Sequence, residues 1–200
     1  MVLLLAVGLG IAVGRALGGR LSHLADLRLR AVWLFYVAIG LQIVAFPSET
    51  LPWSVGDQLA IGMWLLSYGC LVVAAACNLR VKGAAVVGLG MASNLIAVLA
   101  NGGHMPGLPS ALRAAGHMYT GAHNNEVATN HPHLAWLVDR WAVPHWIPGG
   151  NVCSVGDVLI AVGAIVMVSA AMGGQVPFAD RLRRQQPLET GLAGGPTSTP

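Results

Sequence analysis

Five long runs of apolar residues constrain this chain more than any other feature of its sequence. A membrane-crossing helix needs about 20 residues, and runs of nearly this length without alternation of polar and apolar residues favour helices over strands. Hydrophobic residues make up 55% of the chain and charged residues only 10%, a proportion that an ordinary soluble domain cannot cover with polar surface. We therefore expect an all-α, polytopic membrane helix bundle with five transmembrane helices, at about residues 2–17, 31–46, 59–77, 84–100 and 155–172.

The basic residues predict the orientation of these spans. Of the 11 Lys and Arg residues, all but Arg113 and Arg140 fall on one side of the predicted membrane: Arg15, Arg20, Arg28, Arg30, Arg80, Lys82, Arg181, Arg183 and Arg184. Cytoplasmic connections carry the excess of positive charge, so we expect the N-terminus outside and the C-terminus in the cytoplasm. The first run lacks a positively charged leading segment and a clear cleavage site, so we interpret it as a retained span.

This orientation implies one transmembrane domain over residues 1–174, multi-pass in a bacterial cytoplasmic membrane. Residues 175–200 are rich in Pro, Gly, Thr and Gln and are expected to form a disordered cytoplasmic tail. The lipid bilayer is the expected partner. No basic stripe interleaved with aromatic residues occurs, so no nucleic-acid partner is expected.

Small and polar residues stand out within the runs. Small residues recur at every fourth position, a spacing that lets helices approach closely within a bundle: Gly10, Gly14 and Gly18 in the first run, and Ala84, Gly88 and Ala92 in the fourth. No charged side chain lies near the middle of any run, which argues against a proton relay or a voltage sensor. The few polar residues within the runs are Gln42, Ser67, Tyr68 and Asn94.

A long outer loop, residues 101–154, separates the fourth and fifth runs. Its segment H-L-A-W-L-V-D-R-W-A-V-P-H-W-I-P, residues 133–148, is too apolar to stay in water and too short to span a bilayer. We expect an interfacial helix at headgroup depth, ended by Pro144, with its tryptophans in the interface.

Histidines gather in the same loop, where six of the seven occur: His104, His117, His123, His131, His133 and His145. Histidine is a common metal ligand, which makes His131 and His133 of the H-P-H sequence candidate ligands. No H-x-x-x-H or H-E-x-x-H pattern is present, and histidines tolerated in a solvated loop are the simpler interpretation. We therefore assign no metal site and expect no cofactor.

A second group of polar residues lies toward the outer ends of the last two spans. Asn94 and Asn101 are seven residues apart on one face of the fourth helix, Asp139 lies on the apolar loop segment, and Asn151 and Asp157 lie at the outer start of the fifth helix. If these elements converge, carboxylates and carboxamides face one another at the outer membrane surface. Such a site suits a polar headgroup, a small solute or an ion, or acid–base chemistry.

Two resemblances bear on this group. The segments A-N-G-G-H-M-P, from residue 100, and N-V-C-S-V-G-D-V-L-I-A-V-G, from residue 151, resemble an uncharacterised family of bacterial five-helix membrane proteins, a domain of unknown function. That resemblance covers nearly all of the chain except its tail and implies no activity. Residues 134–163 are also similar to the C-terminal part of lipoprotein signal peptidases, and this resemblance implies a catalytic dyad of Asp139 and Asp157.

The peptidase pattern is incomplete in this chain. The family has three residues from its asparagine to its second aspartate, whereas Asn151 and Asp157 are six apart, and the G-N-x-x-D-R helix is absent. Four spans are also typical of that family, against five here. A structural explanation competes for the aspartates, because Ser-Val-Gly-Asp occurs twice, at residues 54–57 and 154–157, and Ser-x-x-Asp before an apolar run is typical of a helix capping box.

Three functions are consistent with these patterns. We favour a non-enzymatic membrane protein with an outward-facing polar site that binds or moves a small polar ligand or lipid headgroup. An aspartyl-dyad membrane hydrolase and a non-catalytic accessory subunit of a membrane complex are the alternatives. The pattern indicates no particular ligand, complex partner or oligomeric state.

Overall fold

The computed structural model describes residues 2–46, 55–116, 126–143 and 152–173. The predicted tail, residues 175–200, lies outside the described residues, as do Asn151, Ser54 and three of the loop histidines, His117, His123 and His145. The chain is mostly helical, which confirms the all-α class. The long helices are α1 (Val2–Ala16), α2 (Trp33–Ala45), α3 (Asp57–Cys77), α4 (Ala84–Ala100) and α6 (Val155–Ala171).

These five helices coincide with the five predicted runs to within two residues at each end. By length and apolar composition, α3 is long enough to cross a membrane, with 21 residues and a mean hydropathy of 2.0. The other four are shorter apolar helices, of 13 to 17 residues as the structure bounds them. The helix positions are thus confirmed, whereas five membrane crossings stay a prediction.

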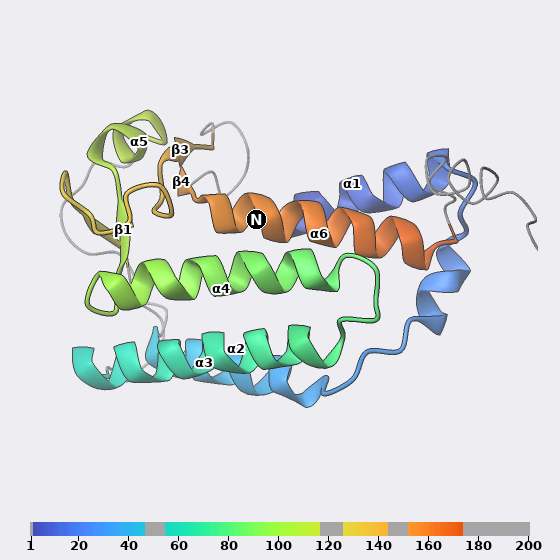
Figure 1. Cartoon of the computed structure of the whole chain (residues 1–200), viewed down its shortest axis with the longest axis horizontal. Coiled ribbons are helices and arrows are strands. Elements are labelled where there is room, and N and C mark those ends of the chain that lie inside the picture. The colour runs from blue at the N-terminus through green and yellow to red at the C-terminus, as the bar shows by residue number, and fades with distance from the viewer. Residues whose placement is uncertain (1, 47–54, 117–125, 144–151, 174–200) are drawn as a thin grey trace, which may run out of the picture.

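The long helices pack in the order α2, α3, α4, α6, α1. Figure 1 shows α4 lying between α3 and α6, with α2 emerging from behind α3 and α1 from behind α6. In the described part of the chain, α1 and α2 do not pack against each other as the other neighbours do. The row of helices is therefore left open between its two end members.

Glycines allow the closest helix contacts, as the spacing predicted for the first run. A Cβ atom built on Gly10 would lie 2.9 Å from Cβ of Val168 on α6, and one on Gly14 would lie 3.2 Å from Cα of Ser169. Gly18 has no such role, because α1 ends at Ala16 and Gly18 follows it with φ +81°.

The contact between α4 and α6 uses glycines that the four-residue spacing of the fourth run did not single out. A Cβ atom on Gly90 would lie 2.5 Å from the carbonyl oxygen of Gly156, and Gly163 packs equally closely against Val87. Gly88, which the four-residue spacing singled out, faces Ala75 of α3 instead. The difference arises because α4 has two packed neighbours, and the sequence pattern does not tell which face meets which.

The outer loop forms a small cap of short elements at one end of the bundle, at the left of Figure 1. It contains β1 (Met105–Gly107), α5 (Pro109–Ala114), β2 (Glu126–Ala128), β3 (Trp141–Ala142) and β4 (Val152–Cys153). Strand β1 pairs in parallel with β2, and β3 pairs antiparallel with β4. Buried residues of α5 and β4, among them Leu112 and Val152, form the core of this cap.

The interfacial helix predicted for residues 133–148 is wrong over its described part, residues 133–143. Turns occupy residues 133–137, where Leu134 has φ +54°, and β3 occupies residues 141–142. The backbone of Asp139 pairs with β1 through Asp139 N to Pro106 O (3.0 Å) and Leu108 N to Asp139 O (2.9 Å). Leu137 is buried against Ala97 and Val98 of α4. The protein itself thus covers part of these apolar residues. Apolar content alone does not distinguish burial within the protein from burial in the membrane interface.

A 3-10 helix, η1 (Leu21–Asp26), connects α1 to α2 at the opposite end of the bundle. Asn78, at the end of α3, secures this connection because its side chain accepts from Arg30 N (2.7 Å) and donates to Arg30 O (2.9 Å). The His23 ring also lies 3.1 Å from the carbonyl oxygen of Met172. The connection is therefore tied to the ends of both α3 and α6.

Candidate functional site

The N-terminus of α6 contains the capping box that the sequence predicts. Ser154 is the N-cap residue, its Oγ accepts from Asp157 N (3.1 Å), and Asp157 Oδ2 accepts from Ser154 N (3.0 Å). The first copy of the tetrapeptide differs. There α3 begins at Asp57 itself, with Gly56 as its N-cap. Ser54 lies outside the described residues, so the capping box predicted for residues 54–57 stays a prediction.

Asn94 of α4 joins this capping box from the neighbouring helix. Its Nδ2 donates to Asp157 Oδ1 (2.9 Å), and its Oδ1 lies 2.8 Å from Ser154 Oγ. Ser154 Oγ also lies 2.9 Å from Asp157 Oδ2, but a hydroxyl has one proton to donate. Because Asp157 already accepts from the Ser154 amide, donation from Ser154 Oγ to Asn94 Oδ1 satisfies every member of the group.

Burial makes this group more than a surface cap. Ser154 is fully buried and Asn94 is 2% exposed, whereas Asp157 is half-buried. Gly156 has no room for a side chain because a Cβ there would collide with the Asn94 amide. The residue type at 156 therefore allows α4 to approach α6 closely enough for Asn94 to reach Asp157. We call Asn94, Ser154 and Asp157 the α4–α6 polar group.

A cavity of about 260 Å³ lies beside the α4–α6 polar group and is reached by Asp157. Its other polar lining residues are Gln42 of α2 and Tyr68 of α3. Tyr68 interacts with the Asn94 side chain, and Gln42 donates through Nε2 to Ser67 Oγ (3.0 Å). Four of the five long helices thus contribute a polar side chain to the cavity wall or to the group behind it.

A second, apolar cavity of about 240 Å³ continues toward the opposite end of the bundle. It lies between the same five helices and ends near Asn78. The two cavities share four lining residues: Leu3, Leu71, Met91 and Ile160. The interior beside the open edge of the helix row is therefore polar at its outer end and apolar along the rest of its length.

Asp139, the other predicted carboxylate, lies on the segment that pairs with β1 and is 9% exposed. Its charge and that of Asp157 both act on Tyr68 and on the Cys153 thiol. Burial raises the pKa of Cys153 above its ordinary value, and the charges of Asp157 and then Asp139 raise that pKa further. Both carboxylates thus act electrostatically on the same two side chains.

Asn101 is separated from this group and has a structural role. Its Nδ2 donates to Ala97 O (2.7 Å) and His133 O (2.9 Å), and its Oδ1 accepts from His133 N (2.8 Å). The amide thereby joins the end of α4 to the outer loop. The structure therefore brings together only part of the predicted ligand-binding set among the described residues: Asn94 with Asp157.

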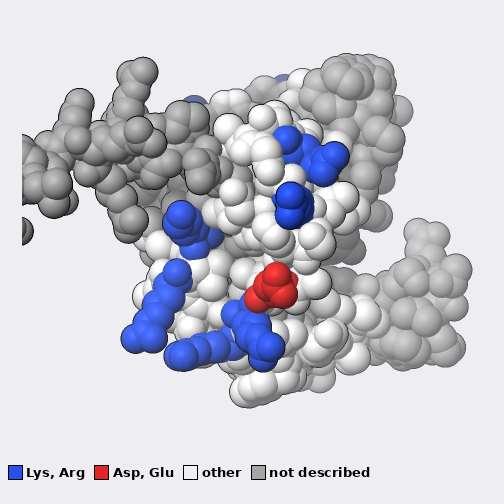
Figure 2. Space-filling model, turned by 90° about the vertical axis from the view of Figure 1, so that its right-hand side faces the viewer, with Lys and Arg blue, Asp and Glu red and all other residues white. Residues whose placement is uncertain are grey.

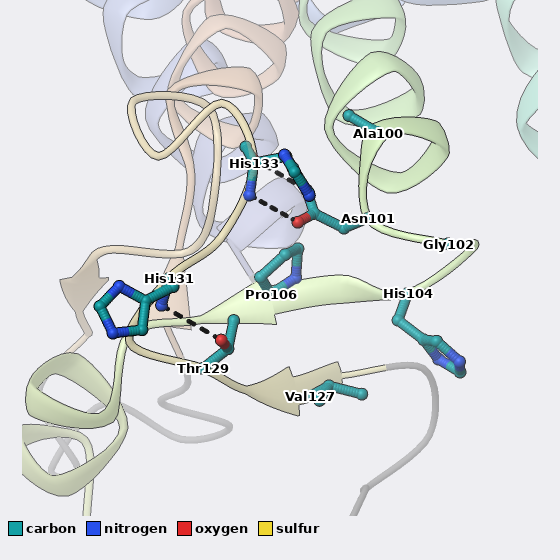
Figure 3. Close-up of a pocket in the computed structure, with 9 residues that line it drawn as sticks. All are labelled: Ala100, Asn101, Gly102, His104, Pro106, Val127, Thr129, His131 and His133. Carbon is teal, nitrogen blue, oxygen red and sulfur yellow. Dashed lines mark hydrogen bonds between the residues drawn. The ribbon is translucent and has the colours of Figure 1, made fainter.

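The loop histidines line a separate outer cavity of about 340 Å³, shown in Figure 3. His104, His131 and His133 contribute to its walls together with Thr129, whose Oγ1 accepts from His131 N (3.2 Å). The imidazole of His131 lies apart from that of His104 in this view. Within the described ranges, no three His, Cys, Asp or Glu side chains are grouped so that they could hold a metal ion.

A family described as a family of unknown function (DUF5317) matches residues 26–169. The chain belongs to this family. The matched range contains the whole α4–α6 polar group and all four strands of the cap, β1 to β4, whereas α1 precedes it. The DUF5317 match confirms the resemblance predicted from the segments around residues 100 and 151, and it leaves the peptidase resemblance a prediction. No curated protein and no solved structure matches the chain.

Three residues of the site were not among those predicted to bind a ligand: Gln42, Tyr68 and Ser154. Two of them, Gln42 and Tyr68, belong to the few polar residues within the apolar runs. Polar side chains within membrane-spanning helices are energetically costly and usually face the bundle interior. Their position within apolar runs is therefore a sequence signal that could have identified Gln42 and Tyr68 as residues of the site. Ser154 carried a signal only for capping, because its contact with Asn94 depends on how α4 and α6 pack.

Proposed function

We propose that this DUF5317 protein is an integral membrane protein that binds a polar ligand at an outward-facing site formed by the α4–α6 polar group, Tyr68 and Gln42. Five helices cross a bacterial cytoplasmic membrane in this proposal, with the N-terminus outside and the C-terminus in the cytoplasm. One observation carries the proposal: a carboxylate held by a buried hydrogen-bonded group faces a cavity lined by two further polar side chains.

The outer faces of the helices support the membrane assignment. Large apolar side chains are exposed along all five, including Leu4 (68%), Tyr36 (71%) and Leu89 (64%). In water this exposure would be unfavourable, whereas hydrocarbon solvates it. Helices of 13 to 17 residues are shorter than the usual span, and local bilayer thinning with flanking arginines that extend to the interface accommodates such lengths.

The charge distribution supports the orientation. Figure 2 shows Lys and Arg gathered at the end of the molecule opposite the cap, beside a single acidic patch. The exposed basic residues of this end, in the described part of the chain, are Arg15, Arg20, Arg28, Arg30, Arg80 and Lys82. The positive-inside rule assigns this end to the cytoplasm and therefore the α4–α6 polar group to the outside.

Helix capping alone does not explain the site. Capping requires Ser154 and Asp157, but not Asn94 on another helix, nor Tyr68 and Gln42 beside the carboxylate. A concave site with an apolar wall and a few convergent polar groups is typical of small-molecule binding. The arrangement around Asp157 has that character.

A membrane hydrolase is the second candidate, on one observation: Asp139 and Asp157 both act on Tyr68 and Cys153. Paired carboxylates can divide acid and base roles when their environments differ. The hydrogen bonds that Asp157 accepts from Ser154 and Asn94 favour binding over catalysis, because they hold the carboxylate in one fixed orientation.

The binding proposal is tested with the first copy of the tetrapeptide as a matched control. Purified protein in mild detergent is heated with a bacterial polar lipid extract and, separately, with the water-soluble small molecules of the same cells. A ligand at 100 times its Kd stabilises the folded state by about 2.7 kcal/mol. We expect at least one fraction to raise the Tm of the wild type and of Asp57→Asn, but not that of Asp157→Asn. An absence of stabilisation by both fractions, or equal stabilisation of Asp157→Asn, contradicts the proposal.

A further inference from the structure

The two interior cavities form one slot along the helix axes. They meet at Leu3, Leu71, Met91 and Ile160, so the polar end at Asp157 and the apolar end near Asn78 lie on one path. Asn78 is buried and its amide is bonded to the backbone of Arg30, which closes the inner end. The slot thus has the polarity and direction of a lipid molecule whose headgroup lies in the outer leaflet.

The open edge of the helix row gives this slot a lateral opening. Residues of α1 (Leu3 and Val7) and of α2 (Phe35 and Gln42) line its two sides, and these helices do not pack against each other in the described part of the chain. In a membrane, such an opening faces the acyl chains of the bilayer. A chain can then enter from the side without passing through the cap.

The two cavities have volumes of about 240 Å³ and about 260 Å³ and meet end to end. A single hydrocarbon chain is narrow enough to follow this path.

Charge selects the headgroup. Among the described residues that line the two cavities, Asp157 is the one with a charged side chain, and no Lys or Arg is present among them to balance the net negative charge of an anionic headgroup. The phosphate of an amine phospholipid, by contrast, is balanced by the ammonium group of the same lipid. An ammonium group supplies both an opposite charge and hydrogen-bond donors, which a carboxylate bound to Asn94 and Ser154 can still accept. An anionic headgroup would place a second negative charge next to Asp157.

We propose, resting on the proposed function above, that the slot binds a phospholipid with an amine headgroup. The ammonium lies at Asp157, beside Tyr68 and Gln42, and one acyl chain occupies the apolar cavity toward Asn78. The lipid enters between α1 and α2 from the outer leaflet. This assignment names the ligand class of the site.

Native mass spectrometry of the purified full chain tests this assignment with three probes at equal concentration. They are palmitoyl-oleoyl phosphatidylethanolamine, the phosphatidylglycerol with the same chains, and free ethanolamine. A charge-assisted hydrogen bond corresponds to about tenfold or more in Kd, so we expect phosphatidylethanolamine to bind at least about tenfold more tightly than phosphatidylglycerol. Asp157→Asn should remove this preference, and Asp57→Asn should retain it.

Two filling variants test the path of the acyl chain. Ala161 lines the polar cavity, whereas its neighbour Val162 is 47% exposed on the outer face of α6. Ala161→Phe should abolish phosphatidylethanolamine binding and Val162→Phe should leave it unchanged. Val7→Phe fills the apolar cavity from α1 and provides a second variant if Ala161→Phe does not fold.

Each contrary outcome overturns a different part of the proposal. Equal or tighter binding of phosphatidylglycerol, or competition by free ethanolamine at lipid concentrations, overturns the amine-lipid assignment. Unchanged phosphatidylethanolamine binding in Ala161→Phe or Val7→Phe overturns the path. If Asp157-dependent stabilisation by the cell fractions persists in these cases, the proposed function stands and only its ligand class fails.

Discussion

At the residue scale, the aspartates of the two Ser-Val-Gly-Asp copies have different surroundings. Asp157 is the third residue of its helix and accepts from Ser154 and Asn94, whereas Asp57 opens its helix without a side-chain cap. The tetrapeptide predicts a helix start in both cases. Asn94 of α4 adds a further hydrogen bond to Asp157, and no local sequence signal contains that contact.

Removing the hydroxyl of Ser154, the N-cap residue of α6, tests how much the α4–α6 polar group contributes to stability. Ser154→Ala should lower the free energy of unfolding by about 1–2 kcal/mol, because the Asp157 amide loses its acceptor. Ser93 on α4 is the matched control, since its hydroxyl is buried without a hydrogen-bond partner in the described structure. Ser93→Ala should be neutral or stabilising. Equal losses for both serines, measured by thermal unfolding in detergent, would contradict the network.

The thiol of Cys153 reports on the charge of the site. Burial, Asp157 and Asp139 raise its pKa, so the reactive thiolate forms only at higher pH than in an ordinary cysteine. In a Cys70→Ala, Cys77→Ala background, maleimide labelling should be slow at neutral pH and should accelerate with rising pH. Asp157→Asn removes one of the charges and should shift the labelling profile to lower pH. A profile unaffected by this substitution would show that Asp157 does not act on Cys153.

At the element scale, the five long helices could be predicted because their apolar runs are local signals, and their observed ends lie within two residues of the predicted ones. The cap could not be predicted in the same way. Residues 133–143 resemble an interfacial helix in composition, but pairing of Asp139 with β1 and of Trp141 with Cys153 fixes them as turns and a strand. These pairings join segments that are distant in the sequence, and apolar content does not encode them.

The close contact between α4 and α6 predicts that alanine substitution has opposite effects on stability at two glycines. A Cβ atom at Gly90 would lie 2.5 Å from Gly156 O, so Gly90→Ala should cost about 1–3 kcal/mol of stability through backbone displacement. Gly62 of α3 has open space around it, and Gly62→Ala should stabilise the protein by up to about 1 kcal/mol because alanine favours helix. Unfolding midpoints of the two variants provide the measurement. A harmless Gly90→Ala would mean that α4 and α6 lie farther apart.

At the scale of the whole molecule, an open row of helices places a polar group at one end and exposed basic residues at the other. By the positive-inside rule, this arrangement supports the proposed orientation, with the cap outside the membrane and the basic end in the cytoplasm. The orientation inferred from the charges of the sequence stays a prediction. The slot between α1 and α2 could not be predicted, because helix order in space is not a local property.

The predicted topology can be tested independently of any ligand. Single cysteines at Asp57, in the outer half, and at Lys82, in the connection between α3 and α4, are introduced into a chain without other cysteines. A membrane-impermeant maleimide applied to intact cells should label the first and not the second. Labelling of the cysteine at 82, or of both, would contradict the orientation.

The central claim is that the slot beside Asp157 holds one amine-headed lipid, and a structure determined by crystallisation from a lipidic phase rich in phosphatidylethanolamine tests it most directly. The account predicts density for an ammonium group within hydrogen-bonding distance of the Asp157 carboxylate, continuous with one acyl chain that runs past Leu71 and Met91 toward Asn78. A slot closed by direct packing of α1 on α2, or a lipid whose headgroup lies away from Asp157, would contradict it.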